Sequence, residues 1–342
     1  MAILFVLSAC APREDAPEVI LYSSVDPDYL RAVLDAFEDE TGVRVRYAGD
    51  TEATKTTGLA TRLLEEHRSG RARADVWWSS EPFWTIRLAD EGALAPYTSH
   101  AAEASIDGGW PGAYRGRDGR WYGFALRARV YVYNTDLVSE HDAPRTPADL
   151  LNERFKGRIG IARPQFGTTR GHMAAMLVTF GEEQFTQWLE GLKANGVRLY
   201  DGNMSVVRAV SSGEIHVGLT DTDDVWAGQR NGWPVALAYE ARAAPPDQPT
   251  LAGGMGALLM PNTIGLVSDA PNQGDAQRFI DFVLSPRAER ILADSDSHNI
   301  PVHPSLARDF SAYRVPDAAD ADLHAVSEAM DRAVELCGRH LE

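Results

Sequence analysis

The sequence predicts an α/β protein that is built from two lobes. Its 342 residues, 44% of them hydrophobic, are enough to bury a large core and exceed one average domain. The segment 18–80 alternates predicted strands and helices in the order βαβαβ, which is typical of a parallel sheet covered by helices. A further apolar strand, predicted over 121–134, is long enough to run from one lobe into the other. We therefore expect a cleft between two α/β lobes.

The first lobe is predicted to begin with a buried strand over 18–24. Asp26 and Pro27 then open a helix, because an acid commonly caps a helix and proline fits its first turn. Gly42 is expected to end this helix. The elements predicted next are a strand at 43–47, a helix at 58–68 and a strand at 74–78.

The remaining elements continue the alternation. The predicted strands are 158–162, 215–219 and 257–267, and the predicted helices are 168–180, 182–194, 226–231, 272–284 and 320–340. We expect the chain to leave the first lobe at 127–129 and to return through the glycine-rich run 253–256. The first lobe then comprises 18–127 and 256–300, and the second lobe comprises 128–255 and 301–342.

Small hydroxyl or acidic residues follow four predicted strands at the point where each strand ends. They are Ser23 and Ser24, Ser79 and Ser80, Gly167, Thr168 and Thr169, and Thr220, Asp221, Thr222 and Asp223. In open α/β sheets, ligands bind outside the carboxyl ends of the strands, and helix N-termini there offer free N–H groups. Each residue alone could be a plain helix cap. Four groups on one edge favour a shared ligand cleft that Asp221 and Asp223 face.

The first residues have the pattern of an export signal. An apolar run over 1–7 leads to a Leu-Ser-Ala-Cys tetrad that ends at Cys10, although no Lys or Arg precedes the run. The tetrad resembles a bacterial lipobox, which implies lipidation of Cys10 and a linker up to residue 17. A periplasmic or cell-surface location follows from this interpretation. The alternative is an apolar terminus with an ordinary cysteine.

The composition argues against several classes of protein. A net charge of −16 disfavours a nucleic-acid partner, because a phosphate backbone requires a basic face. No run of eighteen apolar residues occurs, so we expect no membrane-spanning helix and only the lipid anchor to reach a membrane. Cys10 and Cys337 are the two cysteines, which predicts no disulfide framework and no cysteine-based metal site.

Several segments together resemble family 1 of the bacterial extracellular solute-binding proteins. The similarity is greatest to the ferric-iron-binding branch, and the segments that carry it are 19–24, 74–78, 121–134, 261–267 and 279–286. The resemblance implies the two-lobed type II periplasmic-binding-protein fold, with the ligand cleft between the lobes. It also implies the substrate-binding component of an ABC importer, which delivers a small polar ligand to permease and ATPase subunits. No catalytic residue and no resident cofactor are implied.

The same resemblance implies Fe(III) as the transported ligand. In the iron branch, tyrosine phenolates hold the metal, including an adjacent pair after a strand like 215–219. An accompanying anion rests on an arginine of the crossover strand and on a helix N-terminus. By position, Arg127 is the expected anion-binding residue, above the turn 167–169. The tyrosine pair is replaced here by 220–224, so Asp221 and Asp223 are the expected ligands, since carboxylates suit hard cations.

Two alternatives remain open at this point. Related proteins of the superfamily bind sugar phosphates and phosphonates, so a phosphorylated or phosphonate metabolite would also suit Arg127. The acidic turn 221–225 also resembles the nucleophile motif of haloacid-dehalogenase-like phosphatases. That motif lies late in the chain, however, and no lysine follows Lys193 to steady a phosphoryl group. We therefore expect a binding protein and not an enzyme.

Overall fold

The computed structural model describes all residues except 1–15, 51–55, 107, 244, 246–247 and 342. The predicted lipidation site, Cys10, lies outside these described residues. The strands are β1 (Glu18–Ser23), β2 (Arg44–Gly49), β3 (Val76–Ser79), β4 (Leu94–Ala95), β5 (Tyr122–Asn134), β6 (Ile159–Ala162), β7 (Arg198–Tyr200), β8 (Val217–Asp221), β9 (Val235–Ala238) and β10 (Leu259–Val267). The α-helices are α1 (Pro27–Thr41), α2 (Thr57–Arg68), α3 (Phe83–Asp90), α4 (His100–Ser105), α5 (Gly167–Ala194), α6 (Asn203–Ser211), α7 (Thr222–Arg230), α8 (Gln273–Val283), α9 (Pro286–Asp294) and α10 (Leu323–His340).

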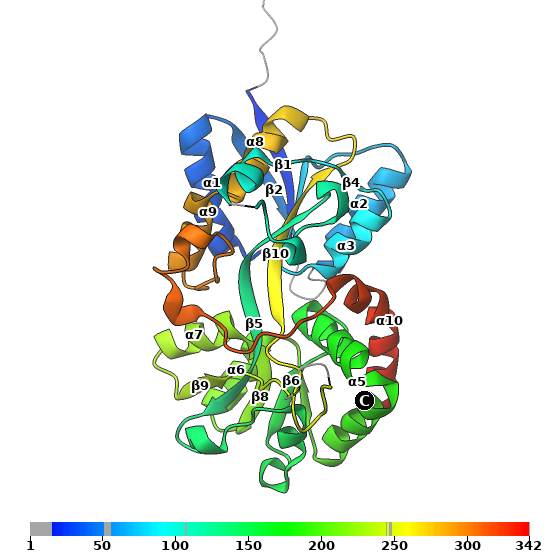
Figure 1. Ribbon diagram of the computed structural model, residues 1–342, viewed down its shortest axis with the longest axis vertical. Helices are drawn as coiled ribbons and strands as arrows, with labels where there is room; N and C mark the ends of the chain where they lie inside the picture. The colour runs from blue at the N-terminus through cyan, green and yellow to red at the C-terminus, as the bar shows by residue number, and fades with distance from the viewer. Residues whose placement is uncertain (1–15, 51–55, 107, 244, 246–247, 342) are drawn as a thin grey trace, which may run out of the picture.

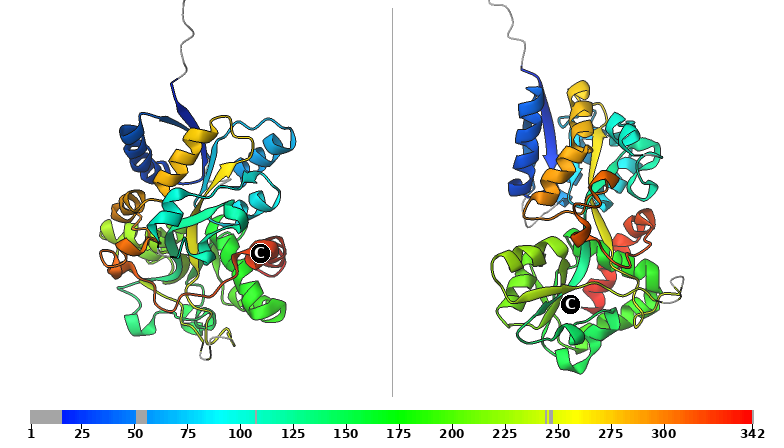
Figure 2. Two further views of the ribbon diagram at one scale, coloured as in Figure 1. Left: turned by 45° about the horizontal axis from the view of Figure 1, so that its top comes forward. Right: turned by 60° about the vertical axis from the view of Figure 1, so that its left-hand side comes forward.

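Two α/β lobes are stacked along the long axis of the molecule and share one mixed sheet (Figure 1). The strands run in the order β2-β1-β3-β10-β5-β8-β6-β7, with β4 paired to β10 and β9 paired to β5. Helices cover both faces of the sheet in each lobe (Figure 2). The predicted two-lobed type II fold is therefore confirmed.

The strand β5 joins the lobes. All thirteen of its residues are buried, and its two halves have different partners. From Tyr122 to Ala128 it pairs antiparallel with β10 of the first lobe. From Arg129 to Tyr133 it pairs antiparallel with β8 of the second lobe. The antiparallel neighbour β10 begins beside Ala128, so two adjacent strands carry the chain between the lobes.

Sequence signals explain where several helices begin and end. The helix α1 has Pro27 at its first position and ends at Gly42, whose φ of 70° is left-handed, as predicted. The helix α5 continues through both predicted segments, 168–180 and 182–194. Gly181 interrupts it with φ 77° and ψ 162°, values that favour glycine, so the predicted break is present inside one longer element.

The C-terminal part of the chain contacts both lobes. Leu306 and Phe310 pack with Ala293 of α9, so this segment lies on the first lobe. The sequence-based prediction had assigned all of 301–342 to the second lobe. The chain then passes the two crossing strands, where Ala318 forms a β-bridge with Ala257. The helix α10 packs on α5 and also on α3. A third connection therefore runs between the lobes.

Apolar residues fill the interior of both lobes, and one buried cluster continues from the first lobe into the second. In the first lobe, Phe37 of α1 contacts Phe279 of α8, and Trp78 of β3 contacts Phe124 of β5. In the second lobe, Phe185 and Trp188 of α5 are stacked and buried. Among the described residues, none of the helices combines the length and the apolar character needed to span a membrane.

Candidate functional site

A small pocket lies between the lobes. It is lined by Thr56, Thr57, Glu81 and Trp84 of the first lobe, by Gly167 and Arg170 of the second, and by Met330 of α10. Its volume of about 10 Å³ holds roughly one water molecule. At this pocket the two lobes therefore leave room for little more than one water molecule.

Asp221 is the centre of a buried polar network at the end of β8. Its Oδ1 accepts a hydrogen bond from Nη1 of Arg129 at 2.8 Å, and its Oδ2 accepts one from Nε of Arg127 at 3.2 Å. Oδ2 also accepts hydrogen bonds from the hydroxyl of Thr168 at 2.6 Å and from Nδ2 of Asn203 at 3.0 Å. Both carboxylate oxygens are thus engaged by the protein itself.

The electrostatics of Asp221 follow from this network. Burial alone would raise its pKa, but Arg129 and Arg127 outweigh the burial and hold the pKa below its ordinary value. Asp221 therefore stays ionised and fixes the two guanidinium groups. The sequence suggested a ligand-facing role for this residue, whereas the structure places it as the counter-ion of Arg127 and Arg129.

Asp223 and Asp224 begin helix α7 beside this network. One oxygen from each of Asp221, Asp223 and Asp224 lies within 4.8 Å of the others. Burial raises the pKa of Asp223 to about 6, while Arg127 opposes the rise and Asp221 adds to it. Oδ1 of Asp223 has no hydrogen-bond partner in the part of the chain that the structure describes. This buried oxygen is therefore left unsatisfied by the described residues.

The four threonines at these strand ends of the second lobe are buried and hydrogen-bonded. Thr220 donates its hydroxyl to Oδ2 of Asp224 at 3.1 Å, and Thr222 accepts the backbone N–H of Ala128 at 3.2 Å. Thr168 and Thr169 are buried at the first turn of α5, within hydrogen-bonding distance of Arg129. Thr220 and Thr222 are fully buried and brace the acidic turn through these hydrogen bonds.

The serines of the first lobe form a second hydrogen-bonded group. The hydroxyl of Ser24 lies 3.3 Å from those of Ser79 and Ser80, and it accepts the backbone N–H of Ser80 at 3.0 Å. Ser23 accepts the backbone N–H of Val25 at 3.1 Å. Glu81 follows this group and accepts the N–H of Phe83 at 2.7 Å, which caps α3. The predicted juxtaposition of the first and third strand ends is thus present.

Sequence reasoning missed Arg129, Asn203, Glu81 and Arg170 as site residues. One signal was available for Arg129, because residues two apart on a strand share a face and Arg127 was already a candidate. Asn203 lies at the start of α6, shortly after β7. It could therefore have been found in the same way as the other groups, which were chosen because they follow the end of a predicted strand. Arg170 and Glu81 reach the interlobe pocket from helix starts.

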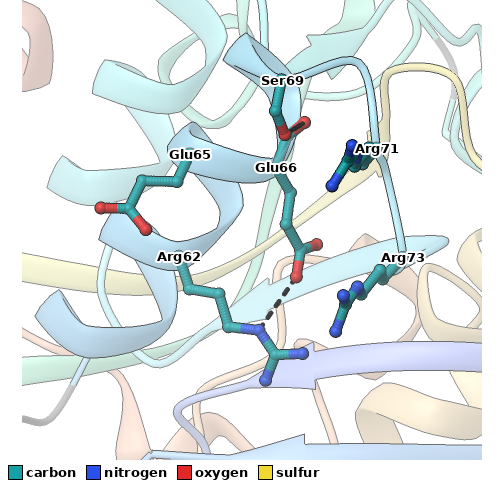
Figure 3. A pocket seen from close by; sticks show the side chains of 6 residues that line it. All are labelled: Arg62, Glu65, Glu66, Ser69, Arg71 and Arg73. Carbon is teal, nitrogen blue, oxygen red and sulfur yellow. Dashed lines mark hydrogen bonds and ion pairs between the residues drawn. The ribbon is translucent and has the colours of Figure 1, made fainter.

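A larger hollow of about 280 Å³ lies elsewhere, on the first lobe (Figure 3). Its lining residues are Arg62, Glu65, Glu66, Ser69, Arg71 and Arg73. Glu66 accepts hydrogen bonds from Nε of Arg62 at 2.9 Å and from the hydroxyl of Tyr22 at 2.8 Å. Tyr22 is buried, and burial together with Glu66 raises its pKa to about 12. Tyr22 is therefore a structural residue that ties β1 to α2.

The chain thus has two lobes that are joined by two crossing strands, with a polar interface between their strand ends. These features define the class of two-lobed ligand-capture proteins. The comparison with known sequences gives the family: its model, described as bacterial extracellular solute-binding protein, matches residues 32–321. The chain belongs to this family.

Several relatives have names that state a ligand. The chain is 29% identical over 321 residues to Iron uptake protein A1 of Synechocystis sp., covering 88% of this chain and 84% of that protein. It is 27% identical over 330 residues to the Fe(3+)-binding periplasmic protein of Serratia marcescens, covering 92% and 90%. It is also 26% identical over 329 residues to the putative 2-aminoethylphosphonate-binding periplasmic protein of Salmonella paratyphi A, covering 93% and 89%.

The fold is shared with a solved structure, iron-bound HitA from Pseudomonas aeruginosa. The two superpose with a TM-score of 0.78 at 24% identity, over 95% of this chain and 99% of that chain. At this identity, the likeness concerns the architecture.

Proposed function

We propose that this chain is the substrate-binding component of an ABC importer and that it captures ferric iron, alone or with a small anion, between its lobes. The observation that carries the proposal is the group of Asp221, Asp223 and Asp224, whose oxygens lie within 4.8 Å of one another at the lobe interface. Hard carboxylate oxygens suit a hard cation such as Fe(III). The relatives named for iron uptake and Fe(3+) binding support the same ligand.

We propose different roles for the three carboxylates. Asp221 already balances Arg127 and Arg129, so Asp223 and Asp224 supply the metal-facing oxygens. Among the described residues, Arg127 is held through a hydrogen bond from its Nε to Asp221, and the rest of its guanidinium group would hold an accompanying anion. The first turn of α5, with Gly167, Thr168 and Thr169, presents backbone N–H groups to the same anion. Ser23, Ser24, Ser79 and Ser80 form the opposite wall.

The proposed mechanism is capture by closure. The lobes rotate about β5 and β10, because these strands carry the chain between them. A ligand that contacts both lobes favours the closed form by its differential affinity. The closed form then docks on the permease and ATPase subunits. We further propose a periplasmic or cell-surface location, with Cys10 as the lipid anchor.

A phosphonate or phosphorylated metabolite is a second candidate ligand. The observation that favours it is the pairing of Arg127 with the first turn of α5, a combination that suits a tetrahedral anion. Asp223 would then accept a hydrogen bond from the amine of an aminophosphonate. One relative is named for such a ligand.

Analysis of protein purified without chelators distinguishes the two ligands. We expect native mass spectrometry and elemental analysis to show about one iron per chain. Calorimetric titration with ferric citrate should then give roughly ten- to hundredfold weaker binding for Asp223→Asn with Asp224→Asn. Asp35→Asn, an exposed acid on α1, is the matched control and should bind like the wild type. A phosphorus-containing adduct without metal would replace iron by the second candidate, and equal affinities would remove the acidic turn from the site.

A further inference from the structure

One face of α7 contacts the first lobe through aromatic side chains. Trp226, in the second turn of this helix, lies edge-on to Tyr313 with ring centroids 4.9 Å apart and to His298 at 5.9 Å. His298 and Tyr313 stack on each other at 4.8 Å with 14° between their planes. Offset and edge-on arrangements at these distances are attractive. Figures 1 and 2 show α7 beside the segment that follows α9.

These rings come from different lobes. The helix α7 packs on α6, β8 and β9 of the second lobe, where Val225 is buried. His298 follows α9, which packs on α1 and α8 of the first lobe. Tyr313 packs on the first lobe with Phe310 and Leu306. The aromatic group therefore bridges the lobes outside the candidate ligand site.

An ion pair extends the same contact. Nε of Arg230, one turn after Trp226, lies 3.1 Å from Oδ1 of Asp296 in the first lobe. His298 has a φ of 44°, which is rare for a residue other than glycine. Its Nδ1 lies 3.2 Å from the carbonyl oxygen of Ala293. The loop is thus held in an uncommon backbone conformation that presents the ring to Trp226.

We propose that Trp226, Arg230, Asp296, His298 and Tyr313 form an interlobe clasp that stabilises the closed arrangement. Asp223 and Asp224 occupy the first turn of α7, and the clasp residues Trp226 and Arg230 follow on the same short helix. A rigid helix that carries both groups couples the position of the carboxylates to the contact between the lobes. The coupling to ligand rests on the proposed function, whereas the effect on closure does not.

The clasp biases an equilibrium between open and closed forms. Loss of one aromatic contact should lower the closed-to-open ratio by up to roughly tenfold, and loss of the exposed ion pair by about two- to fivefold. Ligand affinity falls by the closed fraction that is lost, because only the closed form completes the site. None of the five clasp residues is itself a candidate ligand residue.

Small-angle scattering of the full chain without ligand tests the proposal. Trp226→Leu and Arg230→Asp should each increase the radius of gyration. The double exchange Arg230→Asp with Asp296→Arg should restore the wild-type value, because it re-forms the ion pair in reverse. Matched controls lie within the second lobe alone: Trp233→Leu, and Arg198→Asp, which breaks the pair with Glu214. Both controls should keep wild-type dimensions.

Unchanged dimensions in Arg230→Asp, or failure of the double exchange to restore them, would overturn the clasp. The charge exchange keeps the test decisive if Trp226→Leu does not fold. Titration with ferric citrate then checks the coupling, which requires affinity to fall in the variants that open. Open variants that bind ferric citrate like the wild type would overturn the coupling. Absence of ferric citrate binding in the wild type would reject the proposed function and leave the closure result standing.

Discussion

Arg129 and Asp221 form an ion pair in which Nη1 and Oδ1 are 2.8 Å apart, and their side chains are only 1% and 3% exposed. The two residues are also direct register partners in the antiparallel pair of β5 and β8. The junction between the lobes is thus fixed by charge as well as by backbone hydrogen bonds.

Replacement of Asp221 by Asn should destabilise the ligand-free protein. The change removes the buried counter-charge of Arg129 and one of those of Arg127, and breaking such a pair from one side costs about 3–5 kcal/mol. Urea denaturation of the ligand-free protein measures this cost. Asp223→Asn is the control, and it should leave stability equal or higher because burial disfavours its charge. A wild-type midpoint for Asp221→Asn would show that the arginines find other partners.

Stability should depend on pH through Glu240. This residue is buried, and burial raises its pKa to about 7, while hydrogen bonds from Met255 N–H and the Tyr131 hydroxyl oppose the rise. Below about pH 4 the carboxyl is protonated in the folded and unfolded states, so it carries no penalty. As pH rises to 7, the unfolded state ionises first and the folded state loses about 3 kcal/mol relative to it.

The variant Glu240→Gln isolates this contribution. It should exceed the wild type in unfolding free energy at pH 8 and match it at pH 4. Denaturation curves at the two pH values check the difference, with the exposed Glu65→Gln as control. A gain of equal size at both pH values would mean that ionisation of Glu240 is not the cause.

Gly171 is required where the lobes meet at α3 and α5. A Cβ atom at this position would lie 1.9 Å from Cε2 of Phe83, a fully buried residue of the first lobe. Gly171→Ala should therefore push the helices apart and destabilise the closed protein by about 1–3 kcal/mol. Chemical denaturation and scattering measure both effects. Gly274→Ala, where nothing lies within 4 Å, should be neutral or stabilising.

Ferric ion should stabilise the folded protein if Asp223 and Asp224 bind it. At a free ligand concentration of 100 times Kd, the gain is about 2.7 kcal/mol. A thermal shift assay with ferric citrate should show a higher midpoint that a strong chelator reverses. In Asp223→Asn the shift should shrink while the ligand-free midpoint does not fall. A shift of full size in this variant would argue that the metal is bound elsewhere.

The sequence predicts the order of elements well because its signals are local. Pro27, Gly42 and Gly181 act on the backbone next to them, and each lies where a helix starts, ends or breaks. The strand ends of the two lobes also follow from local patterns. These signals place Asp221 at the edge of the sheet, where the structure has it.

The partner of Asp221 was not predictable in the same way. Its pairing with Arg129 depends on the register of two strands that lie 92 residues apart in the chain. Likewise, the contact of Phe310 with α9 depends on how the C-terminal segment returns to the first lobe. The pattern of charges along a chain does not show which residues will be close together in the fold. In the sequence, an acid that pairs with an arginine is therefore indistinguishable from an acid that binds a ligand.

The division of β5 between two partners has a consequence for fragments of this chain. A lobe produced alone would keep half of β5 and lose the strands that cover the other half. The cut would expose unpaired N–H and C=O groups in a strand whose residues are all buried in the intact protein. Such an edge pairs with other chains, so isolated lobes should aggregate. Two co-expressed halves of the chain should assemble into a folded protein only if the chain is cut outside β5 and β10.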